Sequence, residues 1–234
     1  MRREVRWKNR RRKMSFNIAI DGPAGAGKST IAKMVAKKLD FIYVDTGAMY
    51  RAIALYMLRI GVGKDEAAVA KNVADANVKI AYVNGEQQVI LNGENVSGLI
   101  RTEEVGNMAS FVAKISAVRE CLLELQRNLA AQEDVIMDGR DIGTHILPNA
   151  DVKVYLTASA TERAKRRYKE LVDKGITCNL DEIEQDIIAR DEQDMNREIA
   201  PLKQAEDAVL VDSSFMSIED VVDVIVALYE KADK

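Results

Sequence analysis

The octapeptide GPAGAGKS, Gly22 to Ser29, limits the possible folds of this chain more than any other segment. It fits the pattern G-x-x-x-x-G-K-[ST] completely, between an apolar run that predicts a strand (15–22) and a segment that predicts a helix (28–39). Such a loop wraps its backbone N–H groups around a phosphate chain, and the helix adds the positive end of its dipole. The pattern therefore predicts a nucleoside triphosphate site, with Lys28 on the β- and γ-phosphates and the Ser29 hydroxyl on Mg²⁺. The predicted ATP-binding residues of this P-loop are Gly22, Pro23, Ala24, Gly25, Ala26, Gly27, Lys28, Ser29 and Thr30.

Four further apolar runs have the pattern of buried strands and alternate with helical segments. They are FIYVD (41–45), DVIMD (134–138), DVKVYL (151–156) and AVLVD (208–212). Strands separated by helices are typical of a parallel, doubly wound sheet, so we predict an α/β fold with about five parallel strands and helices on both faces. The last two strands lead into the capping-box patterns Ser159-x-x-Glu162 and Ser217-x-x-Asp220, which predict where helices begin.

The region after the second strand departs from this alternation. A helix there is predicted to bury an apolar stripe of 3–4 spacing, formed by Met49, Ala52, Ile53, Tyr56, Met57 and Ile60. Beyond it, the segment 78–98 has β-rich runs separated by Asn-Gly pairs at 84–85 and 92–93, which favour tight hairpin turns. We therefore expect a small antiparallel insert at about 62–112.

The composition suits a single globular domain. Apolar residues make up 47% and charged residues 30% of the 234 positions, which is ordinary for a chain with a sizeable core. No run approaches the roughly 20 apolar residues that span a bilayer, and the basic N-terminus lacks the apolar stretch of a signal peptide. Cys121 and Cys178 form neither a zinc-ligand spacing nor a disulfide framework. We expect a cytoplasmic protein with no membrane partner.

Charge is unevenly distributed along the chain. Residues 1–13 hold eight basic residues and one acidic residue, whereas the remainder holds 26 basic and 36 acidic residues. A basic tail on an acidic body is able to contact nucleic acid or anionic lipid. Met14 and Ser15, however, stand directly before the first predicted strand, as a natural start would. The preferred interpretation is therefore a disordered, dispensable extension at 1–13 on a single domain at 14–234, with no nucleic acid required.

A second polar segment, MDGRDIGT (137–144), follows from the strand at 134–138. Ligands bind at the carboxyl edge of parallel strands, so these side chains are expected beside the P-loop. Asp138 is placed like the carboxylate that holds Mg²⁺ in P-loop enzymes, partly through water. Arg140 and Asp141 are predicted to point into the same cleft; the alternative is a polar loop with a local salt bridge.

A third segment, ARDEQDMNRE, extends an apolar helical stripe with charged residues. The stripe consists of Ile183, Ile187, Arg190, Asp194 and Arg197, at intervals of four and three. A helix normally turns its charges outward, so this order indicates a cleft for an anionic ligand; a solvated, salt-bridged face is the alternative. In ERAKRR, Arg163 and Arg167 are four residues apart and are expected to reach the donor phosphates.

The arginines indicate the class of acceptor. More of them are available than one triphosphate requires, namely Arg51, Arg140, Arg190 and Arg197. Transfer between two anions needs their repulsion neutralised, and arginine offers bidentate, permanently charged contacts. A phosphate acceptor has a second pKa of about 6, so it is mostly ionised at neutral pH and needs no general base. The sequence therefore favours a nucleoside monophosphate acceptor, with Lys28, Arg140 and Arg197 as catalytic cations and His145 in a structural or exposed position.

Several segments together resemble the bacterial cytidylate kinases, over residues 15–230. The segments that carry the resemblance are IDGPAGAGKST, VDTGAMYRA, VSGLIRTEEV, MDGRDIGT, ERAKRR, RDEQDMNRE and APL. Many enzymes share the P-loop alone, but the combination of DTGAMYR, DGRDIGT and a β-rich insert is specific to this family.

The resemblance implies a P-loop nucleoside monophosphate kinase fold. Its expected parts are a core (14–61, 113–164 and 181–234), a monophosphate-binding insert (about 62–112) and a helical lid (about 165–180). It also implies an ATP- and Mg²⁺-dependent enzyme that acts on CMP or dCMP, expected to be a monomer.

The resemblance further implies a role for individual residues. The residues implied to contact CMP are Thr46, Arg51 and Arg197 at the phosphate, Ser110, Arg119 and Asp141 at the cytosine, and Arg190 and Asp194 at the sugar. Thr46 stands where the motif usually has serine; it keeps the hydroxyl, so the contact is expected to survive.

Two alternatives remain open at this point. A P-loop kinase for another small acceptor, such as UMP, would need the same loop and the same arginines. A nucleotide sensor without catalytic activity would bind ATP and use the basic tail, but it would need no second anion site. A GTPase is disfavoured because the sequence has no N-K-x-D element, and motor ATPases are usually larger.

Overall fold

The computed structural model describes residues 15–233 of the chain. The basic extension predicted at 1–13 lies outside the described residues, so the prediction about it stays a prediction. Within the described part, no helix combines the length and the apolar character needed to cross a membrane.

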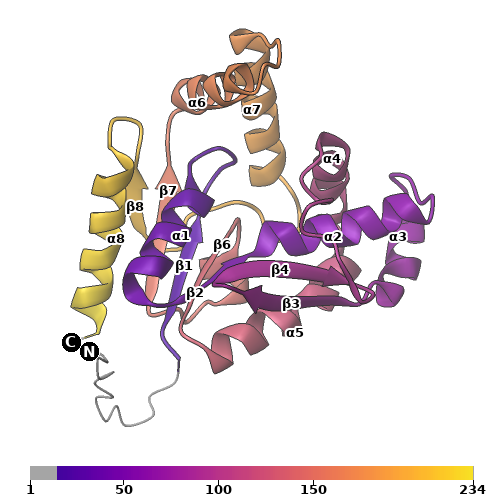
Figure 1. The fold of residues 1–234 in the computed structure, drawn as a ribbon, viewed down its shortest axis with the longest axis horizontal. Coiled ribbons are helices and arrows are strands. Elements are labelled where there is room, and N and C mark those ends of the chain that lie inside the picture. Colours follow the sequence, from indigo (N-terminus) through magenta and orange to yellow (C-terminus); the bar gives the residue numbers. More distant parts are fainter. Residues whose placement is uncertain (1–14, 234) are drawn as a thin grey trace.

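Five parallel strands form the central sheet, in the order β2-β6-β1-β7-β8 (Figure 1). Their bounds are Asn17–Asp21 (β1), Ile42–Asp45 (β2), Val135–Gly139 (β6), Val152–Thr157 (β7) and Val209–Asp212 (β8). All four pairs of neighbours run parallel, and helices separate the strands along the chain. This confirms the predicted α/β fold with five parallel strands.

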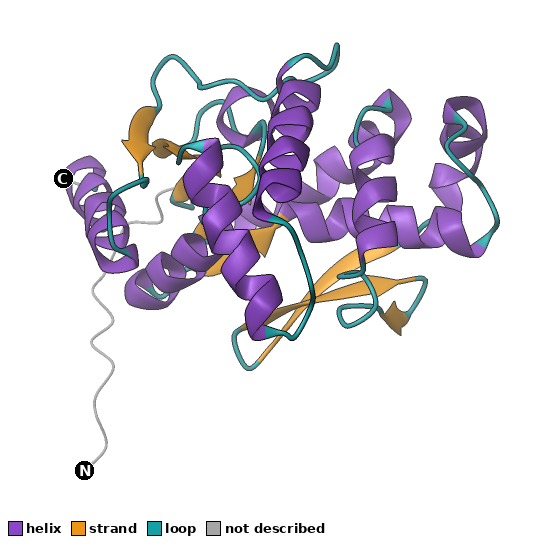
Figure 2. Ribbon diagram, turned by 90° about the horizontal axis from the view of Figure 1, so that it is seen from above, coloured by secondary structure: helices purple, strands orange, loops and turns teal. Residues whose placement is uncertain are grey.

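Helices cover both faces of the sheet, as Figure 2 shows from above. One face packs on α1 (Lys28–Leu39) and α8 (Ile218–Ala232), and the other on α2 (Thr46–Arg59) and α5 (Ser116–Gln132). The alternation of side chains along a strand distributes β1 between two cores, because Ile18 and Ile20 join the first and Ala19 joins the second. Strands buried on both faces explain the continuous apolar runs in the sequence.

An aromatic cluster ties the start of the described chain to its end. The ring centroids of Phe16, before β1, and Tyr229, in α8, lie 4.9 Å apart. Both rings pack edge-on against Phe41, at 6.0 Å and 5.5 Å. Such T-shaped contacts stabilise beyond the apolar area they bury.

The predicted stripe of α2 is correct except at its end. Met49, Ala52, Ile53 and Met57 are fully buried, and Tyr56 is half-buried. Ile60, however, is 42% exposed, because α2 ends at Arg59 and Ile60 is its C-cap. The start of the helix is fixed by Asp45, whose carboxylate accepts a hydrogen bond from the backbone N–H of Ala48.

A small antiparallel sheet lies beside α2, as the Asn-Gly pairs predicted (Figure 1). Its strands are Val78–Val83 (β3), Glu86–Leu91 (β4) and Glu94–Asn95 (β5), preceded by α3 (Glu66–Asn72) and η1 (Val73–Asp75) and followed by α4 (Glu103–Val112). In both turns the Asn and the Gly have φ values between 50° and 88°, the left-handed conformation that two-residue hairpins require.

Two helices, α6 (Ala160–Asp173) and α7 (Leu180–Met195), project beyond the carboxyl edge of the sheet (Figure 1). Ser159 caps α6 by accepting from the Glu162 N–H, but Glu162 pairs with Lys165 instead of completing a capping box. The second predicted box, at Ser217 and Asp220, is complete.

The prediction that the strand at 208–212 is buried was wrong for most of β8. Only Val211 is buried there, whereas Val209 is 42% and Leu210 is 56% exposed. Within residues 15–233, β8 is an edge strand that pairs only with β7. The other edge strand, β2, is buried because the antiparallel sheet packs on it, with Tyr82 and Gln87 bonded to its backbone.

Candidate active site

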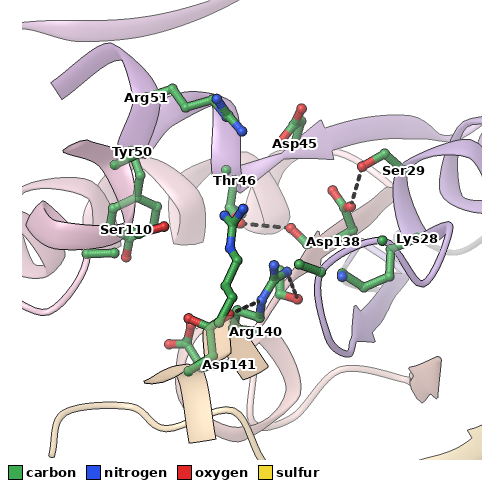
Figure 3. Close-up of a pocket in the computed structure, with 18 of the residues that line it drawn as sticks. Lys28, Ser29, Asp45, Thr46, Tyr50, Arg51, Ser110, Asp138, Arg140 and Asp141 are labelled. Atoms are coloured by element: carbon green, nitrogen blue, oxygen red, sulfur yellow. Dashed lines mark hydrogen bonds and ion pairs between the residues drawn. The ribbon is translucent and has the colours of Figure 1, made fainter. Parts of the chain in front are cut away.

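The carboxyl ends of the parallel strands open into a cavity of about 410 Å³ (Figure 3). Seven basic and four acidic side chains line it. The basic residues are Lys28, Arg51, Arg101, Arg119, Arg140, Arg190 and Arg197, and the acidic residues are Asp45, Asp138, Asp141 and Asp194. An excess of cations in a concave, partly buried site attracts anions strongly.

The P-loop forms one end of the cavity. Gly22 has φ +148°, and a Cβ at this position would lie 1.9 Å from the Leu156 carbonyl oxygen, so only glycine fits between the strands. Lys28 begins α1, and its Nζ donates to the Pro23 carbonyl at 2.7 Å. Burial, and after it the nearby Arg140, lowers the pKa of Lys28 to about 7. A bound phosphate chain would offset both effects and favour the charged ammonium.

Ser29 and Asp138 meet beside Lys28 (Figure 3). The Ser29 hydroxyl donates to Asp138 Oδ2 at 2.9 Å, and the Tyr43 hydroxyl donates to Asp138 Oδ1 at 3.0 Å. Burial and the neighbouring Asp45 raise the pKa of Asp138 to about 6, while Lys28 acts in the opposite direction. Two hard oxygen donors side by side at the P-loop are the ligands that Mg²⁺ prefers.

The start of α2 forms the second anion-attracting part of the cavity. The Thr46 hydroxyl donates to the Asp138 carbonyl at 2.7 Å, which places it between the two ends of the cavity. Arg51 is half-buried, and its Nη1 donates to the Ile100 carbonyl at 3.3 Å. Burial lowers the pKa of Arg51, and the positive charge of the nearby Arg101 lowers it further. An anion bound beside Arg51 would counteract both effects and favour its charged form.

The Arg51 guanidinium packs against α4 at Gly106, a contact that was not predicted from the sequence. A Cβ at position 106 would lie 3.0 Å from Arg51 Nη1 and 3.5 Å from Nη2. Gly106 is buried in the middle of α4, where alanine would favour the helix more. Because Gly106 has no side chain, the Arg51 guanidinium can pack directly against α4 at this position.

A pair of buried arginines surrounds Asp141 at the far end of the cavity. Arg119 forms an ion pair with Asp141, and Arg197 Nη2 lies 3.7 Å from Asp141 Oδ1. Arg119 Nε and Arg197 Nη2 are buried, yet neither has a hydrogen-bond partner among the described residues. Buried donors of this kind are rare in native structures, so these two indicate that a polar ligand completes the site. Tyr50 and Ser110 lie on the same side of the cavity in Figure 3, opposite Lys28.

Asp194 contacts two arginines, Arg140 and Arg197, and a third, Arg190, lies near it. Its Oδ2 accepts from Arg140 Nε at 2.8 Å, and its Oδ1 lies 3.9 Å from Arg197 Nη1. Burial alone would raise the pKa of Asp194, but Arg140, Arg197 and Arg190 together hold it below its usual value. Asp194 is in α7, Arg197 lies just beyond its end, and Arg190 is exposed at the rim.

Asp21 positions the loop that carries Arg140 and Asp141. It ends β1, and its two carboxylate oxygens accept from the backbone N–H groups of Ile142 and Gly143, each at 2.7 Å. Asp21 was not among the predicted site residues, although an acidic residue that ends an apolar strand is a usable signal. Burial raises the pKa of Asp21 to about 6, against the effect of these two hydrogen bonds.

Arg101 and Asp45 also line the cavity without having been predicted to act there. Arg101 Nη2 lies 2.6 Å from Asp45 Oδ2, and the Gln87 side-chain amide exchanges two hydrogen bonds with the Asp45 backbone. These contacts fasten the antiparallel sheet to the end of β2. The segments VDTGAMYRA and VSGLIRTEEV contain both residues, but spacing alone did not pair them.

Most of the predicted site residues line this cavity, but some do not. Those outside the lining are Gly22, Pro23, Ala26, Arg163 and Arg167. Arg163 is buried behind the P-loop, and Arg167 is exposed and paired with Glu170 at 2.9 Å. The structure therefore brings neither arginine to the cavity, and their predicted contact with the donor phosphates stays a prediction. His145 is exposed and outside the lining, as expected for a residue without a catalytic role.

Comparisons with known proteins bear on this arrangement. A family model described as cytidylate kinase matches residues 18–231. A curated cytidylate kinase of Caldicellulosiruptor bescii is 50% identical over 220 residues, which cover 94% of this chain and 97% of the relative. A cytidylate kinase of an Exiguobacterium species is 48% identical over 220 residues, covering 94% and 98%. Among solved structures, an uncharacterized protein from Eubacterium ventriosum has a TM-score of 0.50 at 11% identity, covering 92% of this chain and 99% of that one; this likeness concerns the fold alone.

Proposed function

Because the chain belongs to the cytidylate kinase family, we propose that it transfers the γ-phosphoryl group of ATP to CMP or dCMP. An oxygen of the acceptor phosphate forms a bond to the γ-phosphorus, the bond from that phosphorus to the β,γ-bridging oxygen breaks, and ADP leaves. The observation that carries this proposal is the cavity itself, in which one anion-attracting end faces another.

The donor end consists of the P-loop. Its backbone N–H groups and the start of α1 bind the phosphate chain, and Lys28 stabilises the charge that spreads over the transferring group. Ser29 and Asp138 fit Mg²⁺, since their oxygens already face one another at 2.9 Å. The metal supplies charge neutralisation on the phosphates when it is bound. One or two protein oxygens suffice for Mg²⁺ that arrives with a phosphate chain.

The acceptor end begins at α2. Thr46, Arg51 and Arg197 hold the phosphate of CMP, and Arg140 neutralises charge between the two phosphates. Arg190 and Asp194 face the sugar. No general base is needed, because the phosphate is already ionised at neutral pH. The chain's part in the reaction is therefore to align two anions and to screen their repulsion.

Cytosine recognition falls to Ser110, Arg119 and Asp141. Cytosine presents an amino donor where uracil has a carbonyl, and its N3 accepts where that of uracil donates. The Asp141 carboxylate suits the amino group, and the unpartnered Nε of Arg119 is a donor for the ring acceptors. Uracil would leave one of these buried groups unpaired.

Water has to be kept out, since it competes with CMP for the phosphoryl group. We propose that the insert (about 62–112) and a helical lid (about 165–180) close over the cavity when both substrates are bound. The insert reaches the cavity lining through Arg101 and Ser110, and the helical hairpin reaches it through Arg190 and Asp194 of α7, so these elements would move.

A coupled assay of ADP release over AMP, GMP, UMP, CMP and dCMP tests the proposal. We expect kcat/KM for CMP to exceed that for UMP by roughly 5- to 150-fold, the cost of an unpaired buried polar group. Asp141→Ala should narrow this ratio, mainly by harming CMP, whereas Arg51→Ala should weaken both acceptors alike. Equal use of UMP and CMP by the wild type refutes the cytosine assignment, and ATP binding without any acceptor turnover would favour a sensor.

A further inference from the structure

A buried ion pair lies outside the cavity and has no part in the mechanism above. It joins Arg163 of α6 to Asp191 of α7, with Arg163 Nη2 2.6 Å from Asp191 Oδ2. The side chains are only 5% and 9% exposed. Burying an ion pair costs desolvation that apolar residues would avoid, so stability alone does not explain it.

The guanidinium of Arg163 supports the P-loop from behind. Its Nη1 donates to the Ala24 carbonyl at 3.0 Å, and its Nε donates to the Ala158 carbonyl at 2.8 Å. At Gly25 even a Cβ atom would lie 3.5 Å from the Cβ of Arg163, so the loop rests directly on this side chain. A movement of the loop around a phosphate chain therefore moves the contact surface of Arg163.

Asp191 transmits the position of Arg163 to the acceptor side. Its neighbours in α7, Arg190 and Asp194, both line the cavity, whereas Asp191 faces Arg163. Helix α7 thus carries Asp191, which is paired with Arg163, on one side, and the cavity-lining residues Arg190 and Asp194 on the other. A helix is stiff, so a shift at Asp191 displaces Arg190 and Asp194 as well.

We propose that Arg163 and Asp191 are positioning residues that couple the P-loop to α7, so that bound ATP increases the affinity for CMP. This inference rests on the proposed function. It differs from the expectation that Arg163 contacts the donor phosphates, because the Nε, Nη1 and Nη2 atoms of Arg163 are each bonded to a protein oxygen. Linkage requires the coupling to be reciprocal, so CMP must increase the affinity for ATP by the same factor.

Calorimetric titration of CMP into the full-length protein tests the coupling. The Kd of CMP is measured without nucleotide and with a saturating non-hydrolysable ATP analogue and Mg²⁺, and the ratio of the two values is the coupling factor. We expect roughly a tenfold ratio in the wild type, within the usual range for coupled sites. The ratio should fall toward one in Asp191→Asn, while the Kd of CMP without nucleotide changes little. The matched control is Glu192→Gln, a carboxylate-to-amide change on an exposed residue of the same helix, which should keep the wild-type ratio.

The outcomes separate this inference from its alternatives. A wild-type ratio of one, or an unchanged ratio in a folded Asp191→Asn variant, overturns it. If Asp191→Asn does not fold, Arg163→Lys takes its place; it keeps a charge beside Asp191 but loses the fork, and an unchanged ratio there overturns the inference equally. A purely structural pair would lower thermal stability without changing the ratio. Failure to phosphorylate CMP at all would instead defeat the proposed function.

Discussion

Replacement of Gly106 by alanine should make this protein more stable and a poorer enzyme. Glycine costs about 1 kcal/mol relative to alanine inside a helix, and Gly106 is in the middle of α4. The gain corresponds to an increase of roughly 2–4 °C in Tm for a chain of this size. Outside the backbone of α4, the three atoms nearest to the added methyl group all belong to the Arg51 guanidinium, with Nη1 nearest at 3.0 Å.

Gly106→Ala should, however, weaken the binding of the acceptor phosphate by Arg51. To relieve the contact, the guanidinium of Arg51 must move by a few tenths of an ångström away from α4, and it also loses the weak hydrogen bond to Ile100. A charge-assisted hydrogen bond contributes about 1.5–3 kcal/mol, so partial loss should raise KM roughly 10-fold. Because the phosphate is common to CMP and UMP, both KM values should rise by the same factor, while KM for ATP stays unchanged.

Steady-state kinetics and thermal unfolding test whether the methyl group at position 106 acts through Arg51. The four proteins to compare are the wild type, Gly106→Ala, Arg51→Ala and the double variant. If the methyl group acts through Arg51, it should have no further effect on KM once Arg51 is gone. Gly98→Ala serves as the control, because a Cβ there has no neighbour within 4 Å. An unchanged KM in Gly106→Ala, or the same rise of KM in the Arg51→Ala background, would refute the reasoning.

Two further predictions concern the donor end. Lys28→Ala should lower kcat by roughly 100-fold or more in a protein that still folds, whereas Lys37→Ala, on the exposed side of the same helix, should not; near-normal turnover of the first variant contradicts the catalytic role of Lys28. Burial raises the pKa of Asp138 from 3.8 to about 6, so its ionised form costs the folded state stability above about pH 6, and this cost vanishes below about pH 4. Asp138→Asn should therefore raise Tm near neutral pH but not in acid, while kcat with Mg²⁺ falls; an equal change of Tm at both pH values would show that charge is not the cause.

The sequence predicted the strands, the P-loop and the hairpin turns well, because each depends on local chemistry. Asn84 and Gly85 adopt left-handed conformations that few other residues tolerate, and GPAGAGKS leaves little freedom between a strand and a helix. Burial was harder to predict at the margins. Leu210 has the same apolar character as the residues of β1, but its exposure depends on the place of β8 at the edge of the sheet.

In the site, too, residues within a local motif were predictable, whereas residues that act on distant segments were not. Residues within a motif, such as Lys28 and Asp141, were found because the motif carries its chemistry in order. Asp21 was missed because it acts through backbone groups 121 and 122 positions away. Arg163 was assigned to the phosphates from its charge and its spacing alone, and nothing in its own segment indicates that Asp191 lies next to it.

The aromatic cluster of Phe16, Phe41 and Tyr229 brings the two ends of the described chain together. The fold should therefore tolerate a circular permutation of the chain. A short peptide would be enough to connect the end of α8 to the start of β1, and the polypeptide could then be opened at the exposed turn of Asn84 and Gly85. In such a circular permutant the P-loop would be translated late rather than early. The cavity would still assemble, because it is built by contacts between segments and not by the sequence in which the ribosome delivers them.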